Sequence, residues 1–185
     1  MVLFLILLPF GAFASLMMVT SSIVSVFVAA GIAVATVVYD LAAGRSLKTL
    51  PAGSALVFAA IGFYILLIDG HVTNPSVRFA VDAGVFAIAV VSLAIGRPFT
   101  IEYARELVDA ETLQFPGFHR VNTILTLVWT SAFALMLVTN LLMIYAPTLP
   151  LWVGVAITFA ARSSAAYFTR WYPAYHRTKA SLASH

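Results

Sequence analysis

Six apolar stretches, each close to the length that crosses a lipid bilayer, account for most of this 185-residue chain. About 20 helical residues span the hydrocarbon core of a membrane, and a helix satisfies its own backbone hydrogen bonds there. Only 9% of the residues are charged, against roughly 25% in soluble domains. We therefore predict an all-α, polytopic transmembrane helical bundle that forms one domain over residues 1–185. The six predicted spans are 2–19, 23–41, 54–69, 77–96, 121–146 and 150–169.

The first stretch has two interpretations. A short apolar run ends at Ala12-Phe13-Ala14, which resembles the small-residue site of a cleaved signal peptide. However, no basic residue precedes this run, and apolar residues continue to Val19. Pro9 and Gly11 fit a membrane helix that bends here, because proline removes a backbone donor. We interpret residues 2–19 as a span, and cleavage of the segment stays the alternative.

The cations are distributed unevenly along the chain. With six spans, eight of the ten Lys and Arg residues lie on one face of the membrane, while Arg78 lies on the other and Arg162 lies inside the sixth span. Lys and Arg are retained on the cytoplasmic side, so we expect both termini there. The pI near 9.5 then reflects topology and anionic lipid headgroups, not nucleic-acid binding. The eight cations are Arg45, Lys48, Arg97, Arg105, Arg120, Arg170, Arg177 and Lys179.

The linker 97–119 is the longest polar connection between predicted spans. Pro98 disfavours a simple continuation of the fourth span, and Thr100 can cap a new helix. Phe99, Tyr103 and Leu107 recur at helical spacing, which predicts a short cytoplasmic amphipathic helix over 99–109, with its apolar face against lipid or the bundle and its polar face solvated. The residues of this interfacial motif are Arg97, Pro98, Glu102, Arg105 and Glu106. The last segment, 170–185, is predicted to be a cytoplasmic tail.

Ionisable residues within the spans are the sharpest functional signal. A charge near the bilayer centre is costly and is usually retained for pairing, transport or proton transfer. Arg162 lies near the middle of the sixth span, and snorkelling to the headgroups is the alternative interpretation. Asp82 lies just inside the fourth span, four residues after Arg78, so these two can form an ion pair. The candidate binding or transport residues are Arg162, Asp82, Arg78, Asp40 and Asn140.

Motifs for catalysis or metal binding are not found in the sequence. The chain has no cysteine, which excludes disulfides, thiolate chemistry and cysteine-held metals. Its four histidines are not at metal-ligand spacing, and there is no nucleophile beside a base and no phosphate-binding loop. We therefore expect a protein that is not an enzyme, with no catalytic residues, no metal and no cofactor.

The order of motifs resembles a known family. A pair of spans is followed by a basic hinge near Lys48, a second pair, the dipeptide Arg97-Pro98, a linker with Glu106-Leu107, and a fifth span that opens with Asn122 and Trp129. This layout, with the stretch Gly-Arg-Pro-Phe-Thr-Ile-Glu-Tyr-Ala-Arg-Glu at 96–106, is similar to the intracellular septation protein A family of bacterial inner-membrane proteins, as a divergent relative. The resemblance implies a non-enzymatic role in septation, exerted through membrane partners.

Two functions follow from these observations. The first is a structural or interaction role in cell-envelope maintenance or septation in the bacterial cytoplasmic membrane. Its partners would be the lipid bilayer, other inner-membrane envelope proteins or further copies of the chain, and no nucleic acid. The alternative is a small proton-coupled or anion transporter or channel that uses charged residues within the bundle. The sequence does not identify the solute, the partners or the oligomeric state.

Overall fold

The computed structural model describes the backbone of residues 2–114, 116–146 and 148–183, and the side chains of 8–114, 117–146, 148–150 and 152–176. The prediction of an all-α protein is confirmed, because every regular element in these ranges is a helix. The helices are α1 (Val2–Leu16), α2 (Ser22–Ala42), α3 (Thr49–Leu67), α4 (Asn74–Ala94), α5 (Phe99–Ala104), α6 (Ala110–Gln114), α7 (Pro116–Tyr145) and α8 (Leu151–Ala183).

Four helices are long and apolar enough to cross a membrane. They are α2, α3, α4 and the part Gly117–Tyr145 of α7. The helix α1 is shorter, with 15 residues, and α8 is long but carries Arg162 and other polar residues in its middle. Large apolar side chains such as Leu56 and Phe159, each 72% exposed, project outward from the bundle. Outward-facing apolar side chains of this kind are what a surrounding of lipid requires.

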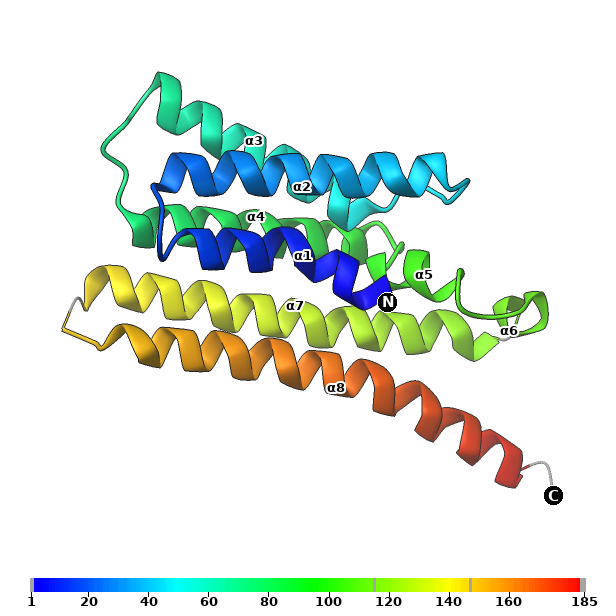
Figure 1. The fold of residues 1–185 in the computed structure, drawn as a ribbon. Coiled ribbons are helices and arrows are strands. Elements are labelled where there is room, and N and C mark those ends of the chain that lie inside the picture. Colours follow the sequence, from blue (N-terminus) through cyan, green and yellow to red (C-terminus); the bar gives the residue numbers. More distant parts are fainter. Residues whose placement is uncertain (1, 115, 147, 184–185) are drawn as a thin grey trace.

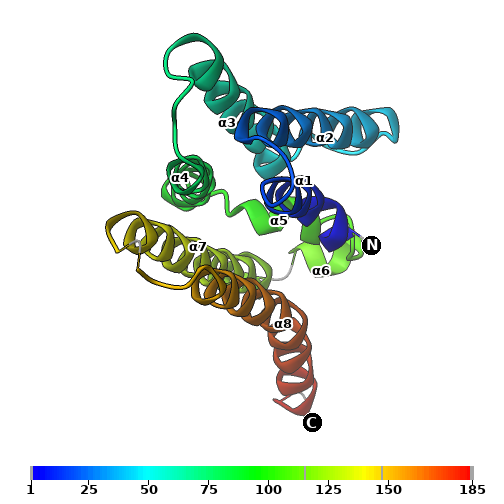
Figure 2. The same cartoon turned by 60° about the vertical axis from the view of Figure 1, so that its left-hand side comes forward.

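The helices follow one another around the bundle in chain order. The helix α1 packs against α2, α2 against α3, and α3 against α4. The helix α4 then packs against α7, and α7 against α8 (Figures 1 and 2). The helices α5 and α6 lie at the end where α2, α4 and α8 finish and α3 and α7 begin, which we name the linker end (Figure 1). In both views the last part of α8 diverges from α7.

Small and aromatic residues set the spacing between these helices. Ser25, Ala29 and Ala33 recur at four-residue spacing on α2, and all three are fully buried. On α4, a Cβ at Gly84 would lie 2.5 Å from the side chain of Val57. Only glycine therefore allows α3 and α4 to approach this closely. Phe58 is fully buried, and its ring centroid lies 5.6 Å from that of Phe10 on α1.

Two regions differ from the sequence-based expectation. The predicted single helix over 99–109 is instead the short helix α5, which ends at Ala104, followed by turns over 105–107 and a bend at Val108 before α6 begins at Ala110. Its apolar side chains Phe99 and Tyr103 are buried against the bundle, whereas Leu107 is 70% exposed. The predicted tail 170–185 continues α8 as helix to Ala183, and its last two residues lie outside the described part.

Candidate functional site: two buried charge clusters and a cavity

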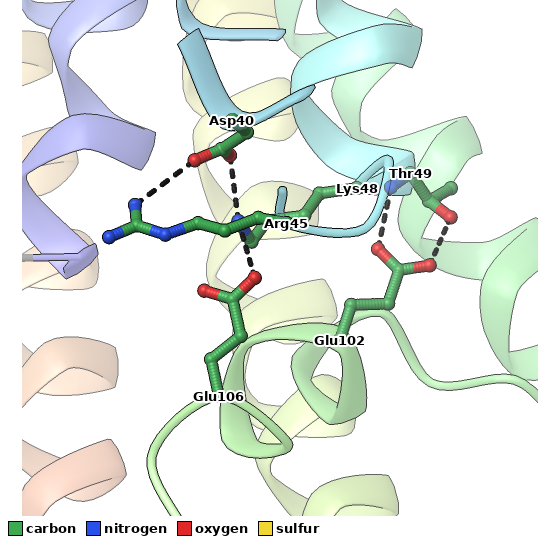
Figure 3. A network of polar contacts seen from close by, with 6 residues as sticks. All are labelled: Asp40, Arg45, Lys48, Thr49, Glu102 and Glu106. Atoms are coloured by element: carbon green, nitrogen blue, oxygen red, sulfur yellow. Dashed lines mark hydrogen bonds and ion pairs between the residues drawn. The ribbon is translucent and has the colours of Figure 1, made fainter. Parts of the chain in front are cut away.

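A group of paired charges lies where α2 ends and α3 begins. We name Asp40, Arg45, Lys48 and Glu106 the linker cluster (Figure 3). The Lys48 ammonium is 2% exposed and lies 2.7 Å from the Asp40 carboxylate and 3.0 Å from that of Glu106. Arg45, which is 36% exposed, contacts the second oxygen of Asp40 at 3.2 Å. Two carboxylates therefore meet two cations, so burial leaves no net charge in the cluster.

A second contact ties α5 to the start of α3. The Glu102 carboxylate accepts hydrogen bonds from the backbone N–H of Thr49, at 2.5 Å, and from the Thr49 hydroxyl (Figure 3). Thr49 is the first residue of α3, where backbone N–H groups have no partner within the helix and a negative charge is stabilising. Glu102 therefore caps α3 from a distant part of the chain, and α5 is anchored to the bundle at two points.

Tyr103 lies beside the linker cluster. Its ring lies 5.6 Å from the Lys48 ammonium, close enough for a cation–π contact. Burial raises the pKa of the Tyr103 phenol well above its usual value, and the nearby carboxylates of Glu102, Asp40 and Glu106 raise the pKa further. The phenol thus stays neutral, and its hydroxyl is buried without a hydrogen-bond partner among the described residues.

The second group of charges lies deeper in the bundle. We name Asp82, Asn140 and Arg162, from α4, α7 and α8, the mid-bundle cluster. Asp82 is 8% exposed, and its carboxylate accepts a hydrogen bond of 2.5 Å from the Asn140 amide. The positive charge of Arg162 acts on Asp82 more strongly than that of Arg78 does. Arg162 makes no ion pair within 4.0 Å in the described part of the chain, and its Nε is buried without a partner there.

A cavity of about 1080 Å³ runs from the mid-bundle cluster to the linker end. Asp82 and Arg162 lie at its deep end, Arg170 lines it partway along α8, and Glu111 and His176 line it at the linker end. Between them the wall is mainly aromatic and aliphatic. One face of α7 supplies much of this wall, with Phe118, Asn122, Leu125, Trp129, Phe133 and Met136 at helical spacing.

Three buried polar atoms without partners belong to residues that line this one cavity. They are Arg162 Nε, Asn122 Oδ1 and the Tyr103 hydroxyl. Buried polar atoms nearly always have a partner, so each exception needs an explanation. Their common location in a large cavity indicates that a ligand or water supplies their missing hydrogen-bond partners. A mostly apolar cavity with a few convergent polar groups is the usual form of a small-molecule site.

The structure brings together only part of the predicted candidate set. Asp82, Asn140 and Arg162 share one cluster. The predicted pairing of Asp82 with Arg78 is wrong, because Asp82 instead bonds to Asn140, and no Arg78 ion pair occurs among the described residues. Asp40 lies apart from these residues, in the linker cluster.

The interfacial motif also divides into inward and outward residues. Arg97 and Arg105 are exposed, while Pro98 is fully buried at the start of α5. The face that Glu102 and Glu106 form is only partly solvated: Glu106 is exposed and Glu102 half-buried, but both carboxylates bind the α2–α3 region. Phe99 and Tyr103 of α5 carry them inward by packing into the core.

Several site residues were not predicted as such. Lys48 was counted only as a loop cation, yet its ammonium is the centre of the linker cluster. Tyr103 was assigned to an apolar face and Asn122 to the opening of a span. A polar residue near the start of a predicted apolar span, as Asn122 is, was the available signal. Comparison with known proteins found no matching family model, curated protein or solved structure.

Proposed function

We propose that the protein binds an anionic solute in its cavity and carries it across the bacterial cytoplasmic membrane. The observation that supports this most is Arg162, a half-buried residue whose Nε is fully buried, at the deep end of the cavity without an ion-pair partner within 4.0 Å among the described residues. A buried cation without a close anion is unfavourable. A solute anion that enters the cavity supplies the missing charge, and Asp82 nearby keeps the empty site from being strongly positive.

A six-span topology with both termini in the cytoplasm fits this function. The helices α1 and α8 run alongside the four candidate spans (Figure 1), and six spans put eight of the ten cations on one face. The linker end would then face the cytoplasm, and the cavity would open on that side. A reporter fused after residue 185 is expected to be cytoplasmic, and one inserted between Asp69 and Ser76 external. A periplasmic C-terminus would contradict the proposed orientation.

Flux into proteoliposomes tests the proposed transport. Chloride, methanesulfonate and octanesulfonate are suitable probes, because the sulfonates keep their charge at all accessible pH values. At least one is expected to enter faster through the wild-type protein than through empty liposomes. Arg162→Gln should abolish that flux, since it removes the only cation at the deep end of the described cavity wall.

The matched control is Arg78→Gln. Arg78 lies on α4 one turn from Asp82, but it does not line the cavity. This variant removes the same charge and should keep most of the flux. Absence of flux for every probe in the wild-type protein would contradict the transport function, and equal losses in the two variants would contradict the role of Arg162.

A structural role in septation is the second candidate, and the motif layout that resembles the septation family favours it. Such a role depends on the folded surface and not on the charge of Arg162. Complementation of a deletion strain separates the two functions. If Arg162→Gln restores normal envelope and division as well as the wild-type gene does, the structural role is supported; if only the wild-type gene does so, transport is supported.

A further inference from the structure

The shape of the cavity defines its ligand further. We propose that the cavity binds an elongated amphipathic anion, with one charged head at Arg162 and an unbranched apolar chain along α7 toward the linker end. This inference rests on the proposed function, since it names the solute class of the same site. The proposed site differs from a site for small hydrophilic anions, because such a site needs neither the length nor the apolar wall of this cavity.

The length of the cavity follows from the register of α7 and α8. These helices are antiparallel neighbours, and the Trp129 indole donates a 3.0 Å hydrogen bond to the Thr169 hydroxyl. Counting back along α8 from this contact places Arg162 at the level of Met136. Asn122 is therefore 14 residues from that level, which is about 21 Å at 1.5 Å per residue. A compact anion fills a small part of this length, whereas an extended chain fills most of it.

The chemistry of the wall agrees with the length. Between Arg162 and Asn122 the α7 side of the cavity presents Met136, Phe133, Trp129 and Leu125. None of these carries a charge, and the Trp129 N–H is already bonded to Thr169. A small anion would lose its hydration shell and gain only the Arg162 contacts. An attached apolar chain leaves water at the same time, which favours binding with each added methylene.

The polar groups that line the cavity indicate where the two ends of the bound ligand lie. At the deep end, the unpartnered Arg162 Nε can donate to an anionic head. At the linker end, Asn122 Oδ1 and the Tyr103 hydroxyl are the other unpartnered atoms among the described residues, and the polar residues Glu111, Thr112 and His176 also line the cavity there. An apolar chain therefore meets a mixed polar and apolar wall beyond the level of Asn122, where each added methylene gains less.

Equilibrium dialysis against the protein in zwitterionic nanodiscs tests this ligand class. The probes are straight-chain alkanesulfonates from methanesulfonate to hexadecanesulfonate, with binding to empty nanodiscs subtracted. Affinity should rise by up to about fourfold per methylene and then level off for the longest chains. Arg162→Gln should lower the affinity for dodecanesulfonate by about tenfold or more, and should not change the affinity for uncharged dodecanol.

Two pairs of variants locate the head and the chain. Arg170 also lines the cavity, eight residues along α8 from Arg162 and so about 12 Å from it, and Arg170→Gln is therefore expected to leave the affinity for dodecanesulfonate within about twofold. Val121→Trp should shorten the chain length at which affinity levels off, because Val121 lines the cavity. Leu127→Trp is the matched control, since Leu127 is 49% exposed on the outer side of α7.

The outcomes separate this inference from the proposed function. If methanesulfonate and chloride bind as tightly as dodecanesulfonate and depend on Arg162, the amphipathic class is wrong while the anion site stands. If Arg170→Gln abolishes binding and Arg162→Gln does not, the head is at Arg170 and the inference fails. Absence of binding for every anion would contradict the proposed function together with the inference.

Discussion

The linker cluster and the mid-bundle cluster both bury charged groups, but only the linker cluster pairs them closely. In the linker cluster, Lys48 contacts two carboxylates at 2.7 and 3.0 Å. In the mid-bundle cluster, Asp82 bonds to an amide and Arg162 has no close anion in the part of the chain that the structure describes. Closely paired charges hold elements together, and a charge left open beside a cavity is available to a ligand.

Removal of Lys48 is expected to have the largest effect on stability. In Lys48→Met, the carboxylates of Asp40 and Glu106 remain close together without their shared cation, and breaking a buried pair in this way costs about 3–5 kcal/mol. Arg45→Met is the control, because Arg45 is partly exposed and such pairs contribute about 1 kcal/mol or less. Thermal unfolding in nanodiscs measures both. Equal, small losses would show that the linker cluster does not hold α5 to the bundle.

Truncation of Glu102 tests the second anchor of α5. Glu102→Ala removes the side chain that accepts two hydrogen bonds from Thr49, and loss of such a cap costs about 1–2 kcal/mol. The neighbouring exposed residue provides the control, since Arg105→Ala should change the free energy of unfolding by less than about 0.5 kcal/mol. If Glu102→Ala lowers the free energy of unfolding no more than Arg105→Ala does, Glu102 does not stabilise the start of α3.

Neutralisation of Asp82 should act on binding in the opposite direction to neutralisation of Arg162. In Asp82→Asn the amide oxygen can still accept from Asn140, while the negative charge that competes for Arg162 is lost. The affinity for dodecanesulfonate is expected to increase by about three- to tenfold. Equilibrium dialysis measures the change. A decrease would mean that Asp82 itself contributes to holding the ligand.

Tyr103 should produce the smallest effect, and one that depends on pH. Its pKa is raised in the folded protein, so its contribution to stability is complete below about pH 10, the pKa of an unperturbed tyrosine. The contribution is lost as the pH rises through the folded pKa, because the unfolded chain ionises first. Unfolding measured from pH 9 to 11 should show a smaller loss for Tyr103→Phe than for the wild type. Identical pH profiles would contradict this.

The fold was predictable from the sequence where the hydrophobic pattern of a helix depends on that helix alone. Hydrophobic stretches identified α2, α3, α4 and α7 to within a few residues at most ends. The start of α3 was missed by five residues, because Pro51 and Gly53 interrupt the apolar pattern there and the helix start is stabilised by Glu102 from another segment. The pattern of 99–109 is amphipathic, yet its helix ends at Ala104.

The site was predictable only as a set of residues, not as a set of contacts. Charges within apolar stretches pointed to Asp82 and Arg162 because their burial is unfavourable anywhere in a bilayer. Their partners depend on which helices are neighbours. The spacing of four residues suggested Arg78 for Asp82, whereas packing of α4 on α7 brings Asn140 to it. Likewise, nothing in the α2–α3 loop indicates that Lys48 meets Glu106, 58 residues further along the chain.

Ligand-induced stabilisation tests most directly whether the mid-bundle cluster binds the ligand while the linker cluster only stabilises the fold. Thermal unfolding in nanodiscs is measured with and without saturating dodecanesulfonate for the wild type, Arg162→Gln and Lys48→Met. A ligand at 100 times its dissociation constant stabilises by about 2.7 kcal/mol. We expect that gain in the wild type and in Lys48→Met, which starts from lower stability, and not in Arg162→Gln. The same gain in Arg162→Gln, or its loss only in Lys48→Met, would contradict the assignment of binding to the mid-bundle cluster.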